Sequence, residues 1–252
     1  MTNTSWENKN NELVDVAMLI ASTVLKSGGE TYRADECVEK ILSANGAHDV
    51  QVFSTPTGIC VSAYFDEVVV SRTASVSERG VDLSCLDECL AVSRLLTEGK
   101  ISLGEAKKRV LNERNKKVNI LYTATMACIC GAFFSLIVGG GWLEFLCSLL
   151  SGFFGMILYY WLGKRNISFF ITNLSATLVF GLIARLFCSA LPSCDVHLSI
   201  IGCIFPLVPG LTTLNAIRDS FNGDIVSTGA RAIEAVITAV AIACGVTIAL
   251  MV

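Results

Sequence analysis

The sequence predicts an α-helical membrane protein with five transmembrane helices, preceded by a small α+β domain. Hydrophobic residues make up 53% of the 252-residue chain and charged residues only 16%, a balance too apolar for an ordinary soluble domain. Charge is unevenly placed, because 14 of the 19 Lys and Arg residues and 17 of the 22 Asp and Glu residues precede residue 118. Beyond that point lie five apolar stretches, each close to the roughly 20 residues that a helix needs to cross a bilayer.

The composition divides the chain into a first domain of residues 1–117 and a membrane domain of residues 118–252. The net charge of -3 provides no basic face, so nucleic-acid binding is excluded as a function. The first ten residues, MTNTSWENKN, lack the basic start and apolar core of a cleavable signal. We therefore expect the amino terminus to stay in the cytoplasm.

The first domain shows alternating helical and strand patterns. Apolar residues at helical spacing over 13–24 predict a helix that the following Ser-Gly-Gly ends, and a second helix is expected over 30–46. Between 49 and 74, β-branched and aromatic residues predict three short strands, which are antiparallel because the links are too short for crossovers. A helix over about 82–97 and another opened by a capping box at 102–105 complete an α+β domain.

The five apolar stretches of the membrane domain are expected to cross the bilayer in alternating directions. Basic residues gather before the first stretch, between the second and third, and between the fourth and fifth, whereas the alternate loops have none. Positive charge stays on the cytoplasmic side, which predicts a cytoplasmic first domain and a carboxyl terminus outside the cell. The stretches cover residues 118–138, 142–162, 167–191, 198–216 and 229–252.

The fourth stretch contains a break signal, Pro206, Pro209 and Gly210 within IFPLVPGLTTLNAIRDS (204–220). Proline lacks an amide N–H and clashes with the carbonyl four residues back, so the helix is expected to kink or break and to release two carbonyl groups. Broken helices whose freed backbone groups line a cavity are a common way to build a transport site at the bilayer midplane. A proline kink packed against neighbouring helices is the alternative.

Polar side chains within the apolar stretches are costly to insert, so each is a candidate for function. We predict that Asn173, Thr212 and Asn215 contact the substrate. Arg185 is a candidate contact for an anionic group of the substrate, and outward snorkelling of its side chain is the alternative. Glu234 is the candidate coupling carboxylate.

Charged residues around the fifth stretch have structural alternatives as well. An internal ion pair between Arg231 and Glu234 is the alternative to a coupling role for Glu234. Asp219, Asp224 and Arg231 are expected at the cytoplasmic mouth of the membrane domain, where a solvated rim is the alternative.

The most concentrated polar segment of the first domain is GGETYR (28–33), which lies between two predicted helices. A helix amino terminus can hold an anion, so Glu30, Thr31 and Arg33 are candidates for a regulatory or ligand site, with an ordinary helix–turn–helix corner as the alternative. GxxxxGK[ST], GxGxxG and GxSxG patterns do not occur, so nucleotide hydrolysis and serine hydrolysis have no support. We predict that the protein is not an enzyme and needs no cofactor.

The eleven cysteines suit a reducing cytoplasm and helix interfaces. They include no CxxC pair, and His48 and His197 are far from any plausible ligand set, so no metal site is expected. Only Cys188 and Cys194 are placed so that they could form a disulfide.

Three segments together resemble the threonine/serine exporter family: SGGETYRADE (27–36), GKISLGEA (99–106) and PLVPGLTTLNAIRDSFNGDIVSTGARAIEA (206–235). The resemblance implies a secondary exporter of small polar metabolites, either threonine and serine or a dicarboxylate such as succinate. Full-length members carry about ten spans after a cytoplasmic domain. A chain with five spans is similar to the larger subunit of a split form, which implies a small membrane-protein subunit that supplies the missing spans, with further oligomerisation possible.

We therefore expect alternating-access efflux across the cell membrane, driven by the proton gradient, with the lipid bilayer, the substrate and a membrane subunit as partners. Two other classes of function compete with this one. The chain would act as a membrane-anchored sensor or enzyme if the first domain carried the activity. It would be a purely structural subunit if no polar residue inside the membrane mattered for transport.

Overall fold

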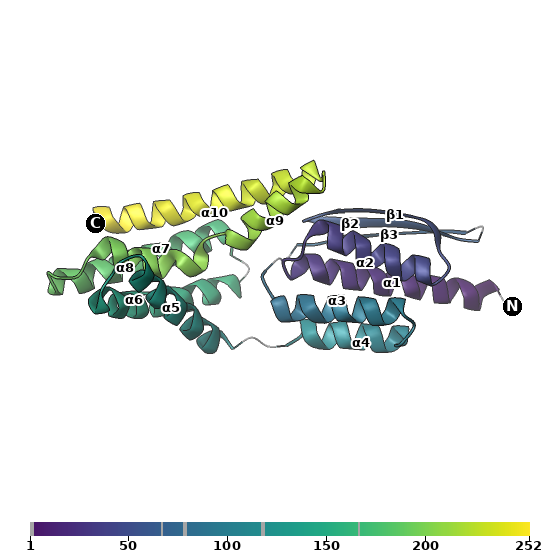
Figure 1. Ribbon diagram of the computed structural model, residues 1–252, viewed down its shortest axis with the longest axis horizontal. Helices are drawn as coiled ribbons and strands as arrows, with labels where there is room; N and C mark the ends of the chain where they lie inside the picture. The colour runs from purple at the N-terminus through teal and green to yellow at the C-terminus, as the bar shows by residue number, and fades with distance from the viewer. Residues whose placement is uncertain (1–2, 67, 78–79, 117–118, 166) are drawn as a thin grey trace. The chain divides into compact units, whose positions relative to one another are not determined.

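The computed structural model describes residues 3–66, 68–77, 80–116, 119–165 and 167–252. Within these ranges the chain forms helices α1 to α10, one 3-10 turn and one three-stranded sheet (Figure 1). The chain divides into two compact units. Unit 1 contains Met1–Lys116 and Leu211–Ala232, and unit 2 contains Lys117–Gly210 and Ile233–Val252. The single boundary predicted near residue 117 took no account of residues 211–232, which join the first unit.

Unit 1 has the predicted α+β order. Its sheet is antiparallel with β2 in the centre, as the short links predicted. The first helix begins ten residues before its apolar pattern, because periodicity marks only the part of a helix that packs against a core. The elements are α1 (Asn3–Lys26), α2 (Thr31–Ala44), β1 (His48–Thr55), β2 (Gly58–Phe65), β3 (Val68–Ser75), α3 (Leu83–Thr97) and α4 (Leu103–Arg114).

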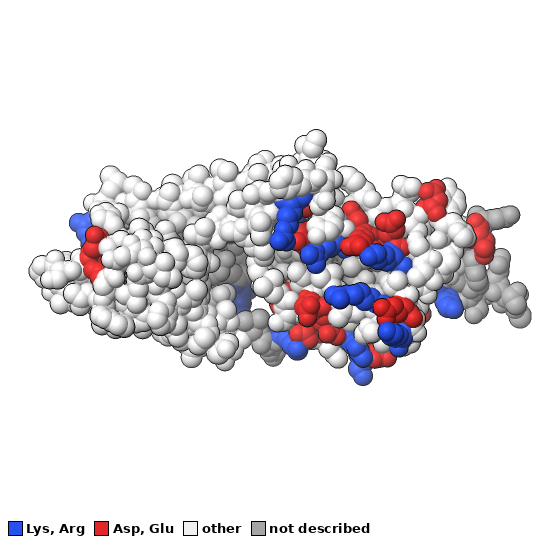
Figure 2. Space-filling view, in the orientation of Figure 1, with Lys and Arg blue, Asp and Glu red and all other residues white. Residues whose placement is uncertain are grey.

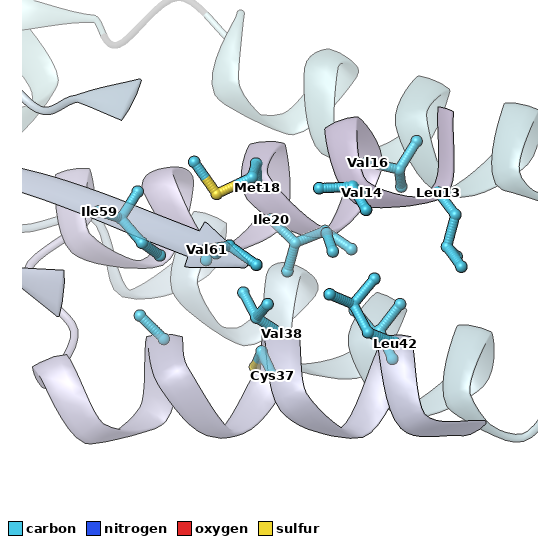
Figure 3. Packing of buried hydrophobic residues seen from close by; sticks show 14 of the residues in the cluster. Leu13, Val14, Val16, Met18, Ile20, Cys37, Val38, Leu42, Ile59 and Val61 are labelled. Atoms are coloured by element: carbon cyan, nitrogen blue, oxygen red, sulfur yellow. The ribbon is translucent and has the colours of Figure 1, made fainter. Parts of the chain in front are cut away.

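Helix α1 is the centre of unit 1. It contacts α2, α3, α4 and the two strands β2 and β3, and Figure 1 shows it between the sheet and the α3–α4 pair. Its apolar positions face α2 and β2 in a common core (Figure 3). The core includes Leu13, Val14, Val16, Met18 and Ile20 of α1, Cys37, Val38 and Leu42 of α2, and Ile59 and Val61 of β2.

Side-chain caps fix the starts of α3 and α4. The Asp82 carboxylate accepts a hydrogen bond from the Cys85 amide at 3.0 Å, and the Ser102 hydroxyl accepts one from the Glu105 amide at 3.2 Å. Each cap satisfies an amide that the helix itself leaves unpaired. The helix start predicted at Ser102 is confirmed.

Unit 2 consists of packed apolar helices. They are α5 (Ile120–Ile137), α6 (Trp142–Gly163), α7 (Phe169–Ala190), α8 (Val196–Ile204) and the part of α10 (Ile225–Met251) from Ile233 onward. Among the described residues, α5, α6, α7 and α10 are long and apolar enough to cross a membrane. The count rises to five if α8 and α9 (Gly210–Phe221) form one span with a break.

Glycines allow the helices of unit 2 to pack closely. Gly131 on α5 lies against the backbone of Gly202 on α8, and a Cβ at Gly245 on α10 would lie only 2.6 Å from the carbonyl oxygen of Leu174 on α7. Gly155 on α6 faces the ring of Phe180. Small residues at such crossings are typical of membrane helices, where packing rather than water exclusion drives association.

Charge separates the units, as the sequence predicted. Figure 2 shows Lys, Arg, Asp and Glu side chains spread over the visible face of unit 1 and almost none on that of unit 2. In unit 2, Cys188 and Cys194 form a disulfide, which confirms the pair chosen from the sequence. The Cys147 sulfur lies within 4.8 Å of both, a grouping of three that the sequence spacing did not predict.

Candidate functional site

The predicted break in the fourth stretch is present. Helix α8 ends at Ile204, a 3-10 turn, η1, covers Phe205–Leu207, and α9 begins at Gly210. Val208, the residue before Pro209, is extended with φ -58° and ψ 128°, as the proline ring requires of its predecessor. The carbonyl of Phe205, which lies four residues before Pro209, accepts a turn bond from the Val208 amide at 3.3 Å. It therefore has a partner within the break itself.

A tight turn, here called the GGET turn (residues 28–31), connects α1 to α2 in unit 1. Gly28 has φ +85°, the left-handed conformation that commonly ends a helix. A Cβ at Gly29 would lie 2.6 Å from Cγ1 of Val24, so no larger residue fits without movement. Glu30 is the N-cap residue of α2. The two glycines thus bring the end of α1 close to the start of α2. Their backbone carbonyls and the side chains of Glu30 and Thr31 are left available for contacts with other parts of unit 1.

The carbonyls of the GGET turn bind side chains of residues 211–232, which we call the α9–α10 corner. The Asn215 amide donates to the carbonyl of Gly28 at 2.9 Å, and the Arg231 guanidinium donates to the carbonyl of Gly29 at 2.7 Å. Both carbonyls therefore serve as acceptors for residues far along the chain.

The side chains of the turn bind the same corner. Glu30 forms ion pairs with Arg218 and with Arg33, the latter at 2.9 Å. The Thr31 hydroxyl oxygen lies 2.9 Å from Oδ1 of Asp219 and 3.1 Å from Oδ2 of Asp224. All four residues of the GGET turn thus contact the α9–α10 corner. We call these residues together the polar cluster: Gly28, Gly29, Glu30, Thr31, Asn215, Arg218, Asp219, Asp224 and Arg231.

A buried ion pair lies at the centre of the polar cluster. Nε of Arg231 is 2.9 Å from Oδ2 of Asp219, and the two side chains are 8% and 0% exposed. The two atoms lack hydrogen-bond alignment, so charge attraction rather than a directed bond holds them. The alternative of a solvated rim is therefore wrong for these two residues. Their burial depends on the GGET turn, which the local sequence did not reveal.

Asp224 has a second function at the corner, as the cap of α10. Its Oδ1 accepts a hydrogen bond from the Ser227 amide at 2.9 Å. Burial alone would raise the pKa of Asp224, but hydrogen bonds from Ser227 and Thr31 outweigh it and lower the pKa below its usual value. Asp224 is therefore suited to remain ionised.

The other predicted site residues are spread over α7, α9, α10 and the proline break. In unit 2, Asn173 is buried and its amide donates to the Phe169 carbonyl at 2.8 Å, while Arg185 is exposed and donates to the Leu250 carbonyl near the end of α10. Thr212 on α9 and Glu234 on α10 are half-buried. Of the break residues, Pro206 and Pro209 are half-buried and Gly210 is exposed. Their roles in transport stay predictions.

Two structurally engaged carboxylates escaped the sequence analysis. Asp35 on α2 binds the Ser54 hydroxyl of β1, and it lies one helical turn after Thr31, a spacing that could have flagged it. Glu144 on α6 is buried and accepts hydrogen bonds from the amides of Gly141 at 2.6 Å and Asp195 at 2.7 Å. It ties two loops of unit 2 together, and only its place three residues after a glycine-rich loop hinted at this.

Known proteins resemble the chain over most of its length. Residues 15–252 match the model of the ThrE family, described as "Putative threonine/serine exporter". The chain is 24% identical over 231 residues to the "Probable succinate transporter subunit YjjP" of Escherichia coli (strain K12), covering 90% of this chain and 89% of that protein. A protein of the same description from Klebsiella aerogenes is 23% identical over 210 residues, covering 80% and 79%. No solved structure matches the chain.

The family match includes the GGET turn, the proline break and the α9–α10 corner. It agrees with the four or five apolar helices that are long enough to span a membrane. The chain belongs to the threonine/serine exporter family of membrane transport proteins.

Proposed function

We propose that the chain is one subunit of a secondary transporter that exports small polar metabolites, either threonine and serine or a dicarboxylate such as succinate, and that the proton gradient drives export. Family membership supports export, and the printed descriptions of the two relatives support succinate as one candidate substrate. The observation that carries the proposal is the polarity of α9, the helix that follows the proline break.

Helix α9 buries two polar side chains and exposes three large apolar ones. Asn215 and Asp219 are 2% and 0% exposed, whereas Leu214, Ile217 and Phe221 on the other face are 43%, 48% and 86% exposed. A helix on a soluble surface has the reverse distribution. Ionisable groups turned inward and apolar groups turned outward are typical of a functional helix in apolar surroundings.

The proposed transport mechanism uses the break as a hinge. Residues 205–209 interrupt the helical hydrogen-bond ladder between α8 and α9 and form short turn bonds instead, so we propose that α9 moves as a rigid piece about them. We propose that its movement alternately exposes a substrate site and that Glu234 carries the coupling proton. The substrate site would use Asn173, Arg185, Thr212, Asn215 and the backbone around Pro206, Pro209 and Gly210.

We propose that a small membrane-protein subunit completes the transport path. The word "subunit" in the descriptions of both relatives supports a partner, and four or five candidate spans are few for a complete path. The decisive measurement is efflux of labelled threonine, serine and succinate from cells that lack the chain. We expect at least one of the three to accumulate, and re-expression to restore efflux only together with the partner. Equal efflux of all three with and without the chain would overturn the proposal.

The proposed orientation places residues 1–116 in the cytoplasm and the carboxyl terminus outside. It is supported by the basic residues that precede α5 and follow α6 and by the basic pair Arg218 and Arg231 near the α9–α10 corner. A reporter fused after Val252 that is active only outside the cell is expected to give signal. Silence of this reporter, with activity of a cytoplasmic reporter at the same position, would contradict the orientation.

A further inference from the structure

The polar cluster extends through the hydroxyl group of Ser54 to Asp35 on α2. Oδ1 of Asp35 lies 2.5 Å from the hydroxyl oxygen of Ser54, and this oxygen also lies 3.3 Å from the backbone carbonyl oxygen of Thr31. Ser54 is buried on β1, and Asp35 is half-buried on α2. Ser54 therefore links Asp35 to the backbone of Thr31, the residue whose hydroxyl group contacts Asp219.

When every carboxylate is ionised, the hydroxyl groups of Ser54 and Thr31 have fewer hydrogens to donate than there are acceptors near them. A hydroxyl group has one hydrogen to donate. Ser54 faces two acceptors, the Asp35 carboxylate and the Thr31 carbonyl, and Thr31 faces two carboxylates, Asp219 and Asp224. The two hydroxyl hydrogens of Ser54 and Thr31 therefore have four possible acceptors. A proton on Asp35 corrects the first shortage, because Asp35 then donates to Ser54 and Ser54 donates to Thr31.

The charges around Asp35 favour the same proton. Negative groups face it from three elements: Glu39 on its own helix, Asp219 on α9 and Asp224 at the start of α10. Burial raises the pKa of Asp35, the Ser54 hydrogen bond lowers it in part, and the three negative neighbours raise it further, so that the pKa lies above its usual value. The arginines of the cluster are engaged elsewhere, since Arg231 pairs with Asp219 and Arg33 and Arg218 pair with Glu30.

We propose that Asp35 is a proton-binding site and that its protonation strengthens the contact between the GGET turn and the α9–α10 corner. Because folding raises the pKa of Asp35, the folded unit binds this proton more tightly than the unfolded chain does. The stabilisation is complete below the ordinary carboxyl pKa of about 4 and is lost as the pH rises through the raised value. Asp224, whose pKa is lowered, has the opposite sign and weakens the contact only when the pH falls below about 4.

If the proposed function is correct, protonation of Asp35 would also regulate export. Helix α9 contributes Asn215, Arg218 and Asp219 to the polar cluster, and it begins directly after the proline break. A stronger contact restrains the helix that we propose to move during export, so we expect export to slow when the pH at this face falls. The ligand is the proton itself.

The test compares wild type with Asp35→Asn, in which the amide imitates the protonated acid. Hydrogen exchange of residues 28–35 and 215–231 is measured from about pH 4, the ordinary carboxyl pKa, up to about pH 8 on the full chain in lipid nanodiscs, with correction for intrinsic exchange. In wild type, opening of these residues should become more frequent as the pH rises. In Asp35→Asn it should be independent of pH, and at pH 8 about two- to tenfold slower than in wild type, as one regained hydrogen bond implies.

Matched variants separate this proposal from others. Asp87→Asn removes an exposed carboxylate from α3 and should keep the wild-type pH dependence, as should the conservative Asp35→Glu. Ser54→Ala removes the hydrogen bond that lowers the pKa of Asp35, so the pH dependence should persist and move to higher pH. The same pH dependence in wild type and in Asp35→Asn would overturn the proton site. Efflux assays on the same variants test the control of export, and absence of efflux in wild type would count against the proposed function while the exchange result stands on its own.

Discussion

Arg231→Ala is expected to destabilise unit 1 severely and to abolish export. The change leaves the fully buried carboxylate of Asp219 without its partner and also removes the hydrogen bond to the Gly29 carbonyl. Breaking a buried ion pair from one side costs about 3–5 kcal/mol, because the remaining charge is neither solvated nor paired. For a unit of this size the thermal midpoint should fall by roughly 10 °C or more. The loss is measured by heating the purified full chain and monitoring the unfolding of unit 1 by its sensitivity to protease.

Two controls test whether the loss of stability comes from the buried charge. Arg109→Ala removes one partner of an exposed pair with Glu105 on α4, and it should change stability by less than about 0.5 kcal/mol. Removing both charges, with Asp219→Asn and Arg231→Gln together, should cost less than the sum of the two single changes, because no uncompensated charge remains. An Arg231→Ala protein as stable as Arg109→Ala would show that the ion pair is not buried in the native protein.

Local sequence patterns were sufficient for most elements of the fold. The helix and strand periodicities of unit 1, the cap at Ser102 and the break between Pro206 and Gly210 all depend on residues close together in the chain. The first, second, third and fifth apolar stretches likewise correspond to helices whose ends lie within four residues of the predicted ends. Such features reflect backbone geometry and burial of one face, and neighbouring residues determine both.

The polar cluster could not be predicted in the same way. Thr31 and Asp219 are separated by 188 positions, and each half has an ordinary local explanation, a helix–turn–helix corner and a solvated rim. The sequence did propose both halves as separate candidate sites. Only the fold shows that they form one site, because the burial of Asp219 depends on a turn near the other end of the chain. Asp35 was missed for the same reason, since its unusual surroundings come from α9 and α10.

The double variant Pro206→Ala, Pro209→Ala is expected to abolish export while the protein still reaches the membrane. Proline inside a helix costs about 3 kcal/mol or more, whereas alanine is the best helix former, so the change favours one continuous helix through the break. Each helical residue turns the chain by about 100°. Converting the extended Val208 and the residue after it into helix would therefore rotate α9 relative to α8, and we expect this rotation to strain the contacts of Asn215 and Asp219 with the GGET turn.

The broken and the continuous helix can be distinguished by experiment. We expect the helix to straighten and the polar cluster to open, and export to be lost because the proposed hinge is gone. Efflux of the labelled metabolites gives the activity, and hydrogen exchange of residues 28–31 reports whether the cluster has opened. Pro192→Ala, in the exposed loop between α7 and α8, should leave both unchanged. Full export by the double variant with an opened cluster would refute the proline break as the moving part of the transporter.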